Sequence, residues 1–330
     1  MLSDEFKTIT TFPCLLSAFE LAQRGKRARE DVAKFRMELE PNLFKLQNRL
    51  RSGAYLPGGY RTFSIYERKP RLISVAPFVD RVVHHCLMAY LAPKMDLQMY
   101  PFSFACRPEK GVHKAVDYYQ FRAQRYAYIL KLDISAYFAS IRHDVLLQQL
   151  QWFQLPKDIY DLIGKIIAST GSSGVGLPIG NLTSQWLANW YLNEIDWWLQ
   201  SQVGGYFRYV DDLYLFADDK VLLWQTLAEL KKRLTNLGLV IAPHKISLRR
   251  TTEKVDVLGY QVSRTRRWLR NDNGHAFLKR FKRMVARVNT GKSNYLAVQP
   301  SIFSWIGHSL HGETLGLRTA IFSEHKFYRV

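Results

Sequence analysis

The chain has 330 residues, enough to bury a large core and to form two or three subdomains. Its apolar fraction of 47% excludes intrinsic disorder, and three widely spaced cysteines exclude a disulfide framework and fit a reducing cytosol. Lys and Arg number 47 against 28 Asp and Glu, and this net charge of +19 favours a polyanionic partner.

The N-terminal third is predicted to combine helices with one hairpin. Residues 1–60 are basic, with helical spacing of apolar side chains interrupted at Pro41. Residues 60–74 indicate two strands that carry the cations Lys69 and Arg71. Such cations could hold a triphosphate, or they are surface charges on an edge strand.

Two further segments precede the middle of the chain. Residues 75–91 are predicted to be a helix. Residues 100–113 then interleave aromatic rings with cations such as Arg107, a composition that suits nucleic-acid binding. A packed loop is the alternative for this second segment.

An acid follows a buried strand in the middle of the chain. Residues 128–133 have the pattern of a strand that ends at Asp133, where the carboxylate is either a ligand or a helix cap. Helices are predicted over 144–169 and 186–198, joined by a glycine-rich loop that allows close backbone approach to a ligand.

The segment Phe207–Phe216 is predicted to be a hairpin with acids at its tip. Short apolar runs flank Asp211 and Asp212. Taken alone, this pair could be an ordinary polar turn.

The remaining chain is predicted to alternate helix and strand before a basic helix. A helix is expected over 221–237, and strands over 238–241 and 257–262. Within 264–292 the apolar residues follow helical spacing, so cations crowd the opposite face in a pattern typical of nucleic-acid binding. These cations include Lys279, Arg280, Lys282, Arg283 and Arg287.

Together, these separated acids and basic surfaces suggest phosphoryl transfer. Carboxylates from different strands, here Asp133, Asp211 and Asp212, could hold two divalent ions at the spacing of an in-line displacement.

Five segments, in order, resemble motifs of reverse transcriptases. The resemblance covers roughly residues 40–310 and rests on these stretches: Leu132-Asp-Ile-Ser-Ala-Tyr-Phe138, Gly176-Leu-Pro-Ile-Gly180, Tyr209-Val-Asp-Asp212, Leu237-Gly-Leu to Lys245, and Val257-Leu-Gly-Tyr260. It implies an α+β right-hand polymerase with fingers, a palm containing an antiparallel sheet, and a helical thumb. The implied limits are 1–60 for an N-terminal helical extension or fingers, 61–127 for fingers, 128–262 for the palm with a finger-side insert at about 145–175, and 263–330 for the thumb.

The resemblance also implies roles for individual residues. Asp133 and Asp211, the backbone carbonyl of Ile134 and the supporting Asp212 would hold two Mg²⁺ ions, with Mn²⁺ as a substitute. The incoming nucleotide would meet Lys69, Arg71, Phe138, Ile179, Gly180 and Lys245. Phe138 would exclude a 2′-hydroxyl, with Tyr137 the weaker claimant, and Lys245 would assist pyrophosphate departure or be an ordinary surface lysine.

One departure from the common family pattern indicates a subtype. Most members resemble Pro-Gln-Gly-x-x-x-Ser-Pro here, whereas this chain has Ile179 and Gln185 at the variable positions. That form resembles the enzymes of diversity-generating retroelements, which copy a template RNA into cDNA with errors at adenines. An apolar Ile179 offers no hydrogen bond near the nascent pair, which could lower discrimination.

The subtype implies partners: template RNA, primer or cDNA, dNTPs and a small basic accessory protein that forms an oligomeric ring. No apolar run is long enough to cross a membrane, so a cytoplasmic protein of bacterial or phage origin is expected. The alternatives are an antiphage-defence, retron or group II intron-like enzyme, an RNA-templated RNA polymerase, or a non-catalytic RNA-binding scaffold.

Overall fold

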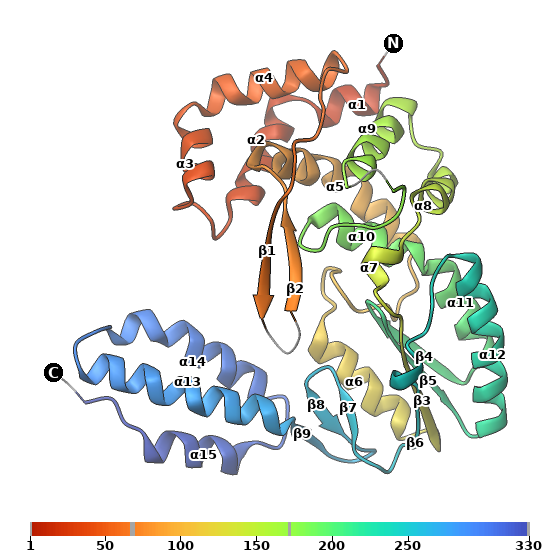
Figure 1. Cartoon of the computed structure of the whole chain (residues 1–330), viewed down its shortest axis with the longest axis vertical. Coiled ribbons are helices and arrows are strands. Elements are labelled where there is room, and N and C mark those ends of the chain that lie inside the picture. Colours follow the sequence, from red (N-terminus) through yellow and green to blue (C-terminus); the bar gives the residue numbers. More distant parts are fainter. Residues whose placement is uncertain (1, 67–69, 171–172, 329–330) are drawn as a thin grey trace.

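The computed structural model describes residues 2–66, 70–170 and 173–328. Figure 1 shows three parts: N-terminal helices with a protruding hairpin, a central sheet flanked by helices, and a C-terminal helical group. Helices and antiparallel sheets occur together in one chain, so the predicted α+β class is confirmed.

The N-terminal part surrounds one long helix, α5 (Phe78–Gln98). Helix α2 packs against α5, and the Phe19 ring of α2 meets the Phe78 ring of α5 edge-on with centroids 5.8 Å apart, because helical spacing places apolar side chains on facing stripes. The other helices of this part are α1 (Asp4–Ile9), α2 (Phe12–Gln23), α3 (Glu30–Met37) and α4 (Leu39–Arg51).

A two-stranded hairpin extends from this helical part toward the rest of the molecule (Figure 1). Strand β1 (Arg61–Tyr66) pairs with β2 (Pro70–Val75) in antiparallel register, as the sequence predicts. Lys69 lies outside the described residues.

The central sheet is antiparallel, with strand order β4-β5-β3-β6. Its strands are β3 (Tyr128–Asp133), β4 (Gly205–Tyr209), β5 (Asp212–Ala217) and β6 (Ser247–Arg250). The register places Asp133 directly opposite Asp212. Strands β4 and β5 pair in antiparallel register with Tyr209 opposite Asp212, so the predicted hairpin of residues 207–216 is confirmed.

Helices cover both faces of this sheet. Alternating residues point to opposite faces, so Leu130 and Leu132 join one core and Ile129 another. The first face packs against α11 (Asn193–Gln202) and α12 (Lys220–Asn236), and the second packs against α6 (Val112–Ala123).

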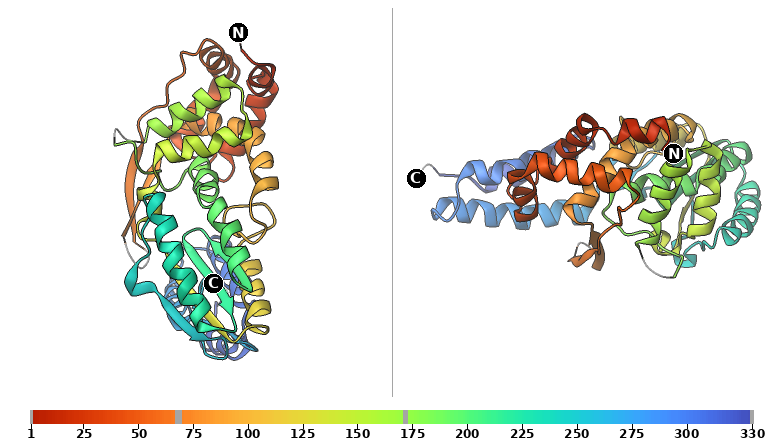
Figure 2. Two further views of the ribbon diagram at one scale, coloured as in Figure 1. Left: turned by 90° about the vertical axis from the view of Figure 1, so that its right-hand side faces the viewer. Right: turned by 90° about the horizontal axis from the view of Figure 1, so that it is seen from above.

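The C-terminal part begins with a small antiparallel sheet and continues as three helices. Its helices, in blue, project away from the rest of the molecule in the right-hand view of Figure 2. Phe277 of α13 stacks on Trp305 of α14 with ring centroids 3.9 Å apart. The elements are β7 (Val255–Val257), β8 (Tyr260–Val262), β9 (Arg267–Leu269), α13 (Asn271–Asn289), α14 (Tyr295–Ser309) and α15 (Leu315–Glu324).

Several predicted elements are divided. The helix predicted over 144–169 is α8 (His143–Leu150), a short 3-10 turn (Gln151–Phe153) and α9 (Lys157–Ala168). Gln154 there adopts a left-handed conformation with φ 46°, and Pro156 removes a backbone donor, so one helix cannot continue. The helix predicted over 186–198 is likewise divided, between α10 (Leu182–Tyr191) and α11.

Two strand predictions also need correction. Residues 238–241 contribute one isolated bridge, Ile134 to Ile241, and the neighbouring sheet strand is β6 instead. Residues 257–262 turn at their centre, because Leu258 and Gly259 have φ values of 48° and 96° that suit a tight hairpin. No helix in the described part of the chain is both long and apolar enough to cross a membrane.

Candidate active site

The tip of the β4–β5 hairpin brings three carboxylates together. Asp211 and Asp212 follow the turn residue Val210, and Asp133 ends the adjacent strand opposite Asp212. The amide of Ile134 donates to the Asp211 carbonyl at 3.1 Å, which ties the two strand ends. Sequence reasoning predicted this convergence from segments almost eighty residues apart, and it is observed.

The turn itself is strained. Val210 has φ 56°, a left-handed conformation that is unfavourable for a β-branched residue. Such strain costs on the order of 1–3 kcal/mol and persists where the surrounding structure compensates for it. The compensating contacts come from a buried arginine two residues earlier in the chain.

Arg208 and Asp196 form an ion pair beneath the turn. Both side chains are almost fully buried, at 1% and 0% exposure, and the guanidinium Nη2 lies 2.6 Å from Asp196 Oδ2. Arg208 also donates to the carbonyl of Val210 at 2.9 Å and to the side chain and backbone oxygens of Asn189. The pair thus connects the turn to α10 and α11.

The carboxylates at the hairpin tip are partly shielded from water and repel one another. Burial, then the charges of Asp212 and Asp133, raise the pKa of Asp211 to about 6. Burial is also the main cause that raises the pKa of Asp212, opposed by Lys131. Lys245 Nζ lies 2.5 Å from Asp133 Oδ2 and Lys131 Nζ lies 3.8 Å from Asp212 Oδ1, so two ammonium groups partly offset the negative charge.

The donor set at the tip suits hard divalent cations. Carboxylate and carbonyl oxygens are the ligands that Mg²⁺ prefers, and no backbone N–H of the described residues donates to the Ile134 carbonyl. Within the described residues, no three His, Cys, Asp or Glu side chains are arranged to hold an ion by themselves.

A glycine-rich loop connects the segment that follows Asp133 to strand β2. The Leu177 amide donates to the Phe138 carbonyl at 2.7 Å, and the Ser74 amide of β2 donates to the Ile179 carbonyl at 3.0 Å. Gly180 adopts φ 111°, and a Cβ there would lie 3.0 Å from Ile73 Cγ2. Only glycine meets both requirements without strain. The loop is thereby docked against the strand that carries Arg71.

Aromatic side chains next to Asp133 differ in exposure. Tyr137, in the short helix α7 (Tyr137–Ser140), is buried and donates its hydroxyl to the Ala188 carbonyl. Phe138 is half-buried. Between the two, Phe138 has the ring that a substrate could contact.

Other predicted residues on this side of the molecule are accessible. Arg71 is exposed on β2, and Ile179 is 38% exposed. Gln185 lies half-buried in α10, where its side chain makes no hydrogen bond to any of the described residues.

The prediction that Arg107 binds nucleic acid is wrong. Its side chain is 4% exposed and paired with Asp96 at 2.6 Å. The same guanidinium donates to the carbonyls of Asp96, Tyr100 and Ser103. Arg107 therefore holds the loop between α5 and α6 in place, as the packed-loop alternative expects for this one residue.

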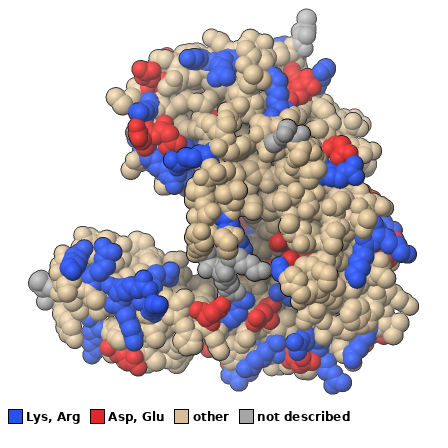
Figure 3. All heavy atoms as spheres, in the orientation of Figure 1, with Lys and Arg blue, Asp and Glu red and all other residues tan. Residues whose placement is uncertain are grey.

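The basic face of α13 is present as predicted. Phe277, Phe281 and Val285 turn inward, and the cations occupy the outer side of the helix. Lys279, Arg280, Lys282, Arg283 and Arg287 are all exposed, and none has an acidic partner within 4.0 Å among the described residues. Figure 3 shows Lys and Arg gathered over the C-terminal helices.

Sequence reasoning missed the support beneath the hairpin. Arg208 interrupts the apolar run of β4, and a lone charge in a buried strand is a signal of an internal partner. Nothing in the sequence pointed to Asp196 or Asn189 as that partner. Lys131, which faces Asp212, was also overlooked although it lies two residues before Asp133 and so on the same strand face.

Comparisons with known proteins agree with this arrangement. Residues 63–262 match the family described as "Reverse transcriptase (RNA-dependent DNA polymerase)". No curated protein matches the chain.

Solved structures with similar folds include fungal telomerases. Apo telomerase from Candida tropicalis has a TM-score of 0.50 and 11% identity over 66% of this chain and 49% of that one. Telomerase from Candida albicans, solved in complex with a fragment of telomeric RNA, has a TM-score of 0.49 and 15% identity over 83% and 56%. The chain thus spans about half the length of these proteins, and the first similarity supports the same α+β polymerase fold.

Proposed function

Because the chain belongs to the reverse transcriptase (RNA-dependent DNA polymerase) family, we propose that it extends a DNA primer on an RNA template. The observation that carries this proposal is the meeting of Asp133, Asp211 and Asp212 at the open end of the sheet. Nucleotidyl transfer depends mostly on positioning and electrostatics, and rigid strand ends supply both.

In this proposal Asp133, Asp211, the supporting Asp212 and the Ile134 carbonyl hold two Mg²⁺ ions, with Mn²⁺ as a substitute. Such ions, when bound, lower the pKa of the primer hydroxyl and neutralise charge on the departing pyrophosphate. Lys245 lies 2.5 Å from Asp133 and would donate a proton to the departing pyrophosphate from beside the carboxylates.

The glycine-rich loop and strand β2 would bind the nucleotide. Arg71, together with Lys69, meets the triphosphate, while Ile179 and Gly180 line the approach. Phe138 is half-buried and would exclude a nucleotide that carries a 2′-hydroxyl, so that the product is DNA. Tyr137 is buried, so its ring would not take this role. The exposed cations of α13 would contact the phosphates of the primer–template duplex.

We further propose the division into subdomains that the sequence suggests: an extension at 1–60, fingers at 61–127, palm at 128–262 and thumb at 263–330. The family match ends at residue 262, which supports the last limit. The finger-side insert at about 145–175 is supported by α9, because Asp158 there accepts from the Ser3 hydroxyl of the N-terminal part at 2.8 Å.

The finer proposal is that the enzyme makes adenine-mutagenised cDNA from the template RNA of a diversity-generating retroelement. Ile179 presents an exposed apolar side chain where most family members have Gln, and Gln185 replaces their Pro. A small basic accessory protein forming an oligomeric ring would then be a partner. The net charge of +19 is consistent with a large RNA partner.

Primer extension on a defined RNA template tests both levels of the proposal. Asp133→Asn and Asp211→Asn should each abolish Mg²⁺-dependent extension with dNTPs, whereas Asp161→Asn on the surface of α9 should not. Retained activity in either catalytic variant would falsify the metal assignment.

Sequencing of the cDNA addresses the subtype separately. Ile179→Gln should change the frequency of misincorporation opposite adenine while synthesis continues. An unchanged adenine error spectrum would rule out a role of Ile179 in fidelity and leave the polymerase assignment intact.

A further inference from the structure

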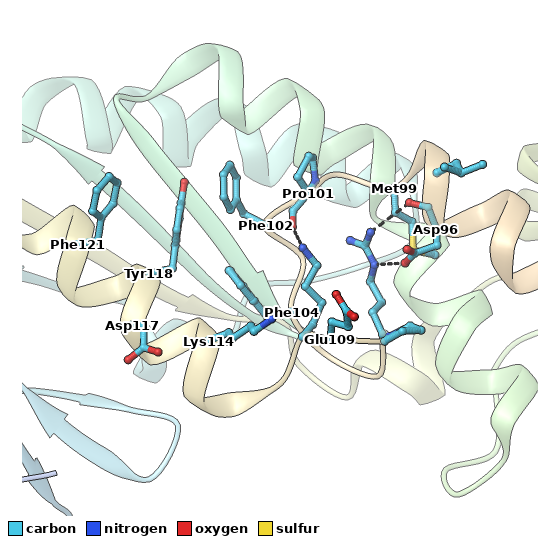
Figure 4. Close-up of a pocket in the computed structure, with 14 residues that line it drawn as sticks. Asp96, Met99, Pro101, Phe102, Phe104, Glu109, Lys114, Asp117, Tyr118 and Phe121 are labelled. Carbon is cyan, nitrogen blue, oxygen red and sulfur yellow. Dashed lines mark hydrogen bonds and ion pairs between the residues drawn. The ribbon is translucent and has the colours of Figure 1, made fainter. Parts of the chain in front are cut away.

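A groove on the outer side of α6 has features that the proposed polymerase chemistry does not use. The cavity has a volume of about 750 Å³ and is lined by the loop between α5 and α6 and by α6 itself. Figure 4 shows the rings of Phe102, Tyr118 and Phe121 side by side along it. None of the residues assigned to the proposed active site lines this groove.

The aromatic row is not explained by core packing alone. Phe102 and Tyr118 stack with ring centroids 4.1 Å apart, and Tyr118 and Phe121 follow at 6.1 Å with planes 29° apart. Phe121 is 42% exposed and belongs to neither hydrophobic core. Its helix buries Val116, Tyr119 and Ala123 toward the sheet, so Phe121 lies on the side away from it.

Guanidinium groups continue the row of planes. The Arg125 guanidinium lies over the Phe121 ring at 3.5 Å, and the Arg122 guanidinium lies 4.9 Å from the Tyr118 ring centroid. Arg122 also donates to the Tyr118 hydroxyl at 2.8 Å, which fixes both planes. Aromatic rings and guanidinium groups are the two protein surfaces on which unpaired bases stack.

The charge balance of the groove favours an anion. Two of its lining carboxylates are engaged, Asp96 by Arg107 at 2.6 Å and Asp117 by Arg267 at 2.8 Å. Among the described residues, the remaining lining carboxylate, Glu109, has no cation within 4.0 Å.

Cations outnumber that one acid along the groove. Lys110 and Lys114 line it, and Arg122 and Arg125 flank the aromatic row. An excess of cations beside stackable planes matches a nucleic-acid strand, whereas an acidic peptide would leave the row of rings without a function.

We propose that this groove binds a single-stranded nucleic-acid segment that lies outside the primer–template duplex. The proposal rests on the proposed polymerase function, because it assigns a second contact to a nucleic acid of that reaction. Bases stack at the Phe121–Arg125 end, and phosphates meet Lys114 and Lys110. The strand is either template RNA or cDNA, since both present the same stacking and phosphate chemistry.

The test uses the full chain preloaded with a short primer–template duplex that occupies the catalytic cleft. Anisotropy then measures the affinity for labelled RNA and DNA oligomers of about 12 nucleotides, a typical site size for single strands. Phe121→Ala and Arg125→Glu should each weaken binding by about tenfold or more. Trp224→Ala, a 48% exposed ring on α12, serves as the matched control and should not.

The two oligomers separate the sources of the strand, because a preference for RNA identifies template and a preference for DNA identifies cDNA. Extension of the short duplex should be equal in all four proteins. Unchanged oligomer affinity in both groove variants would overturn the inference. It would also be overturned if the groove variants lost affinity for an acidic peptide probe and kept their affinity for both oligomers. A parallel fall in extension would assign the groove to the catalytic cleft instead. Absence of extension in the unmodified protein would count against the polymerase proposal, and oligomer binding would still test the groove.

Discussion

Replacing buried Arg208 by Met should lower the free energy of unfolding far more than the same replacement of an exposed arginine that also makes two hydrogen bonds to one carboxylate. The guanidinium makes five hydrogen bonds, to Asp196, Asn189 and the Val210 carbonyl, with both charged groups out of contact with water. Removing it leaves the Asp196 carboxylate buried, with the Tyr206 hydroxyl still donating at 2.7 Å.

The expected loss is about 3–5 kcal/mol of unfolding free energy, the usual cost of breaking a buried ion pair from one side. Arg266 supplies the control, because it also makes two hydrogen bonds to one carboxylate, that of Glu313, yet both side chains are well exposed, at 60% and 45%. Arg266→Met should cost far less, because water solvates both exposed groups and screens their attraction.

A double-mutant cycle measures the pair itself. Asp196→Leu alone should be as harmful as Arg208→Met, while the double variant should be more stable than either single one, because no unpaired charge remains. Urea unfolding followed by circular dichroism gives the four free energies. Additive effects, or equal losses in Arg208→Met and Arg266→Met, would refute the reasoning.

Three further expectations concern the site and its surroundings. Asp211→Asn should raise the unfolding free energy at pH 8 by about 2 kcal/mol and change little at pH 4, because the folded-state pKa of about 6 lies above the ordinary value for Asp, so that the cost of ionisation grows between these two pH values and is complete at pH 8. Urea titrations in EDTA at both pH values measure this, and an equal effect at pH 4 would contradict it. Gly180→Ala should raise the KM for dNTP because its Cβ would press on Ile73 at 3.0 Å, whereas Gly164→Ala, with nothing within 4 Å, should leave steady-state kinetics unchanged. Lys282→Ala on α13 should reduce the slope of the logarithm of duplex affinity against the logarithm of KCl concentration by about one released ion. An unchanged slope would show that the duplex binds elsewhere.

The sequence predicted those features that depend on local pattern. Two apolar runs around Asp211 and Asp212 can form little other than a hairpin, and the helical spacing of Phe277 and Phe281 sets the outward face of α13. The proximity of Asp133 was predicted from an acid at the end of a buried strand and from the family resemblance, whereas the pairing of β3 with β5 across so long an interval is decided by the whole sheet.

What the sequence could not reveal depends on tertiary partners. Arg107 and Arg208 are both buried arginines, but Arg107 in its loop looks like a surface residue, and the acid that pairs with Arg208 cannot be identified until the fold places Asp196 beside it. The division of residues 144–169 into two helices was signalled by Pro156, yet the amphipathic pattern continues through it and outweighed that signal.

The outward face of α13 also bears on movement. Five long, flexible cations on one helix, which pair with no acid in the part of the chain that the structure describes, have no preferred alignment along a chain of equivalent phosphates. A duplex bound there could advance by one nucleotide and exchange each phosphate contact for an identical one. The helix could therefore bind the duplex and still let it move along its surface. Such a surface would be blind to sequence, and the choice of which RNA to copy would have to come from contacts elsewhere on the molecule.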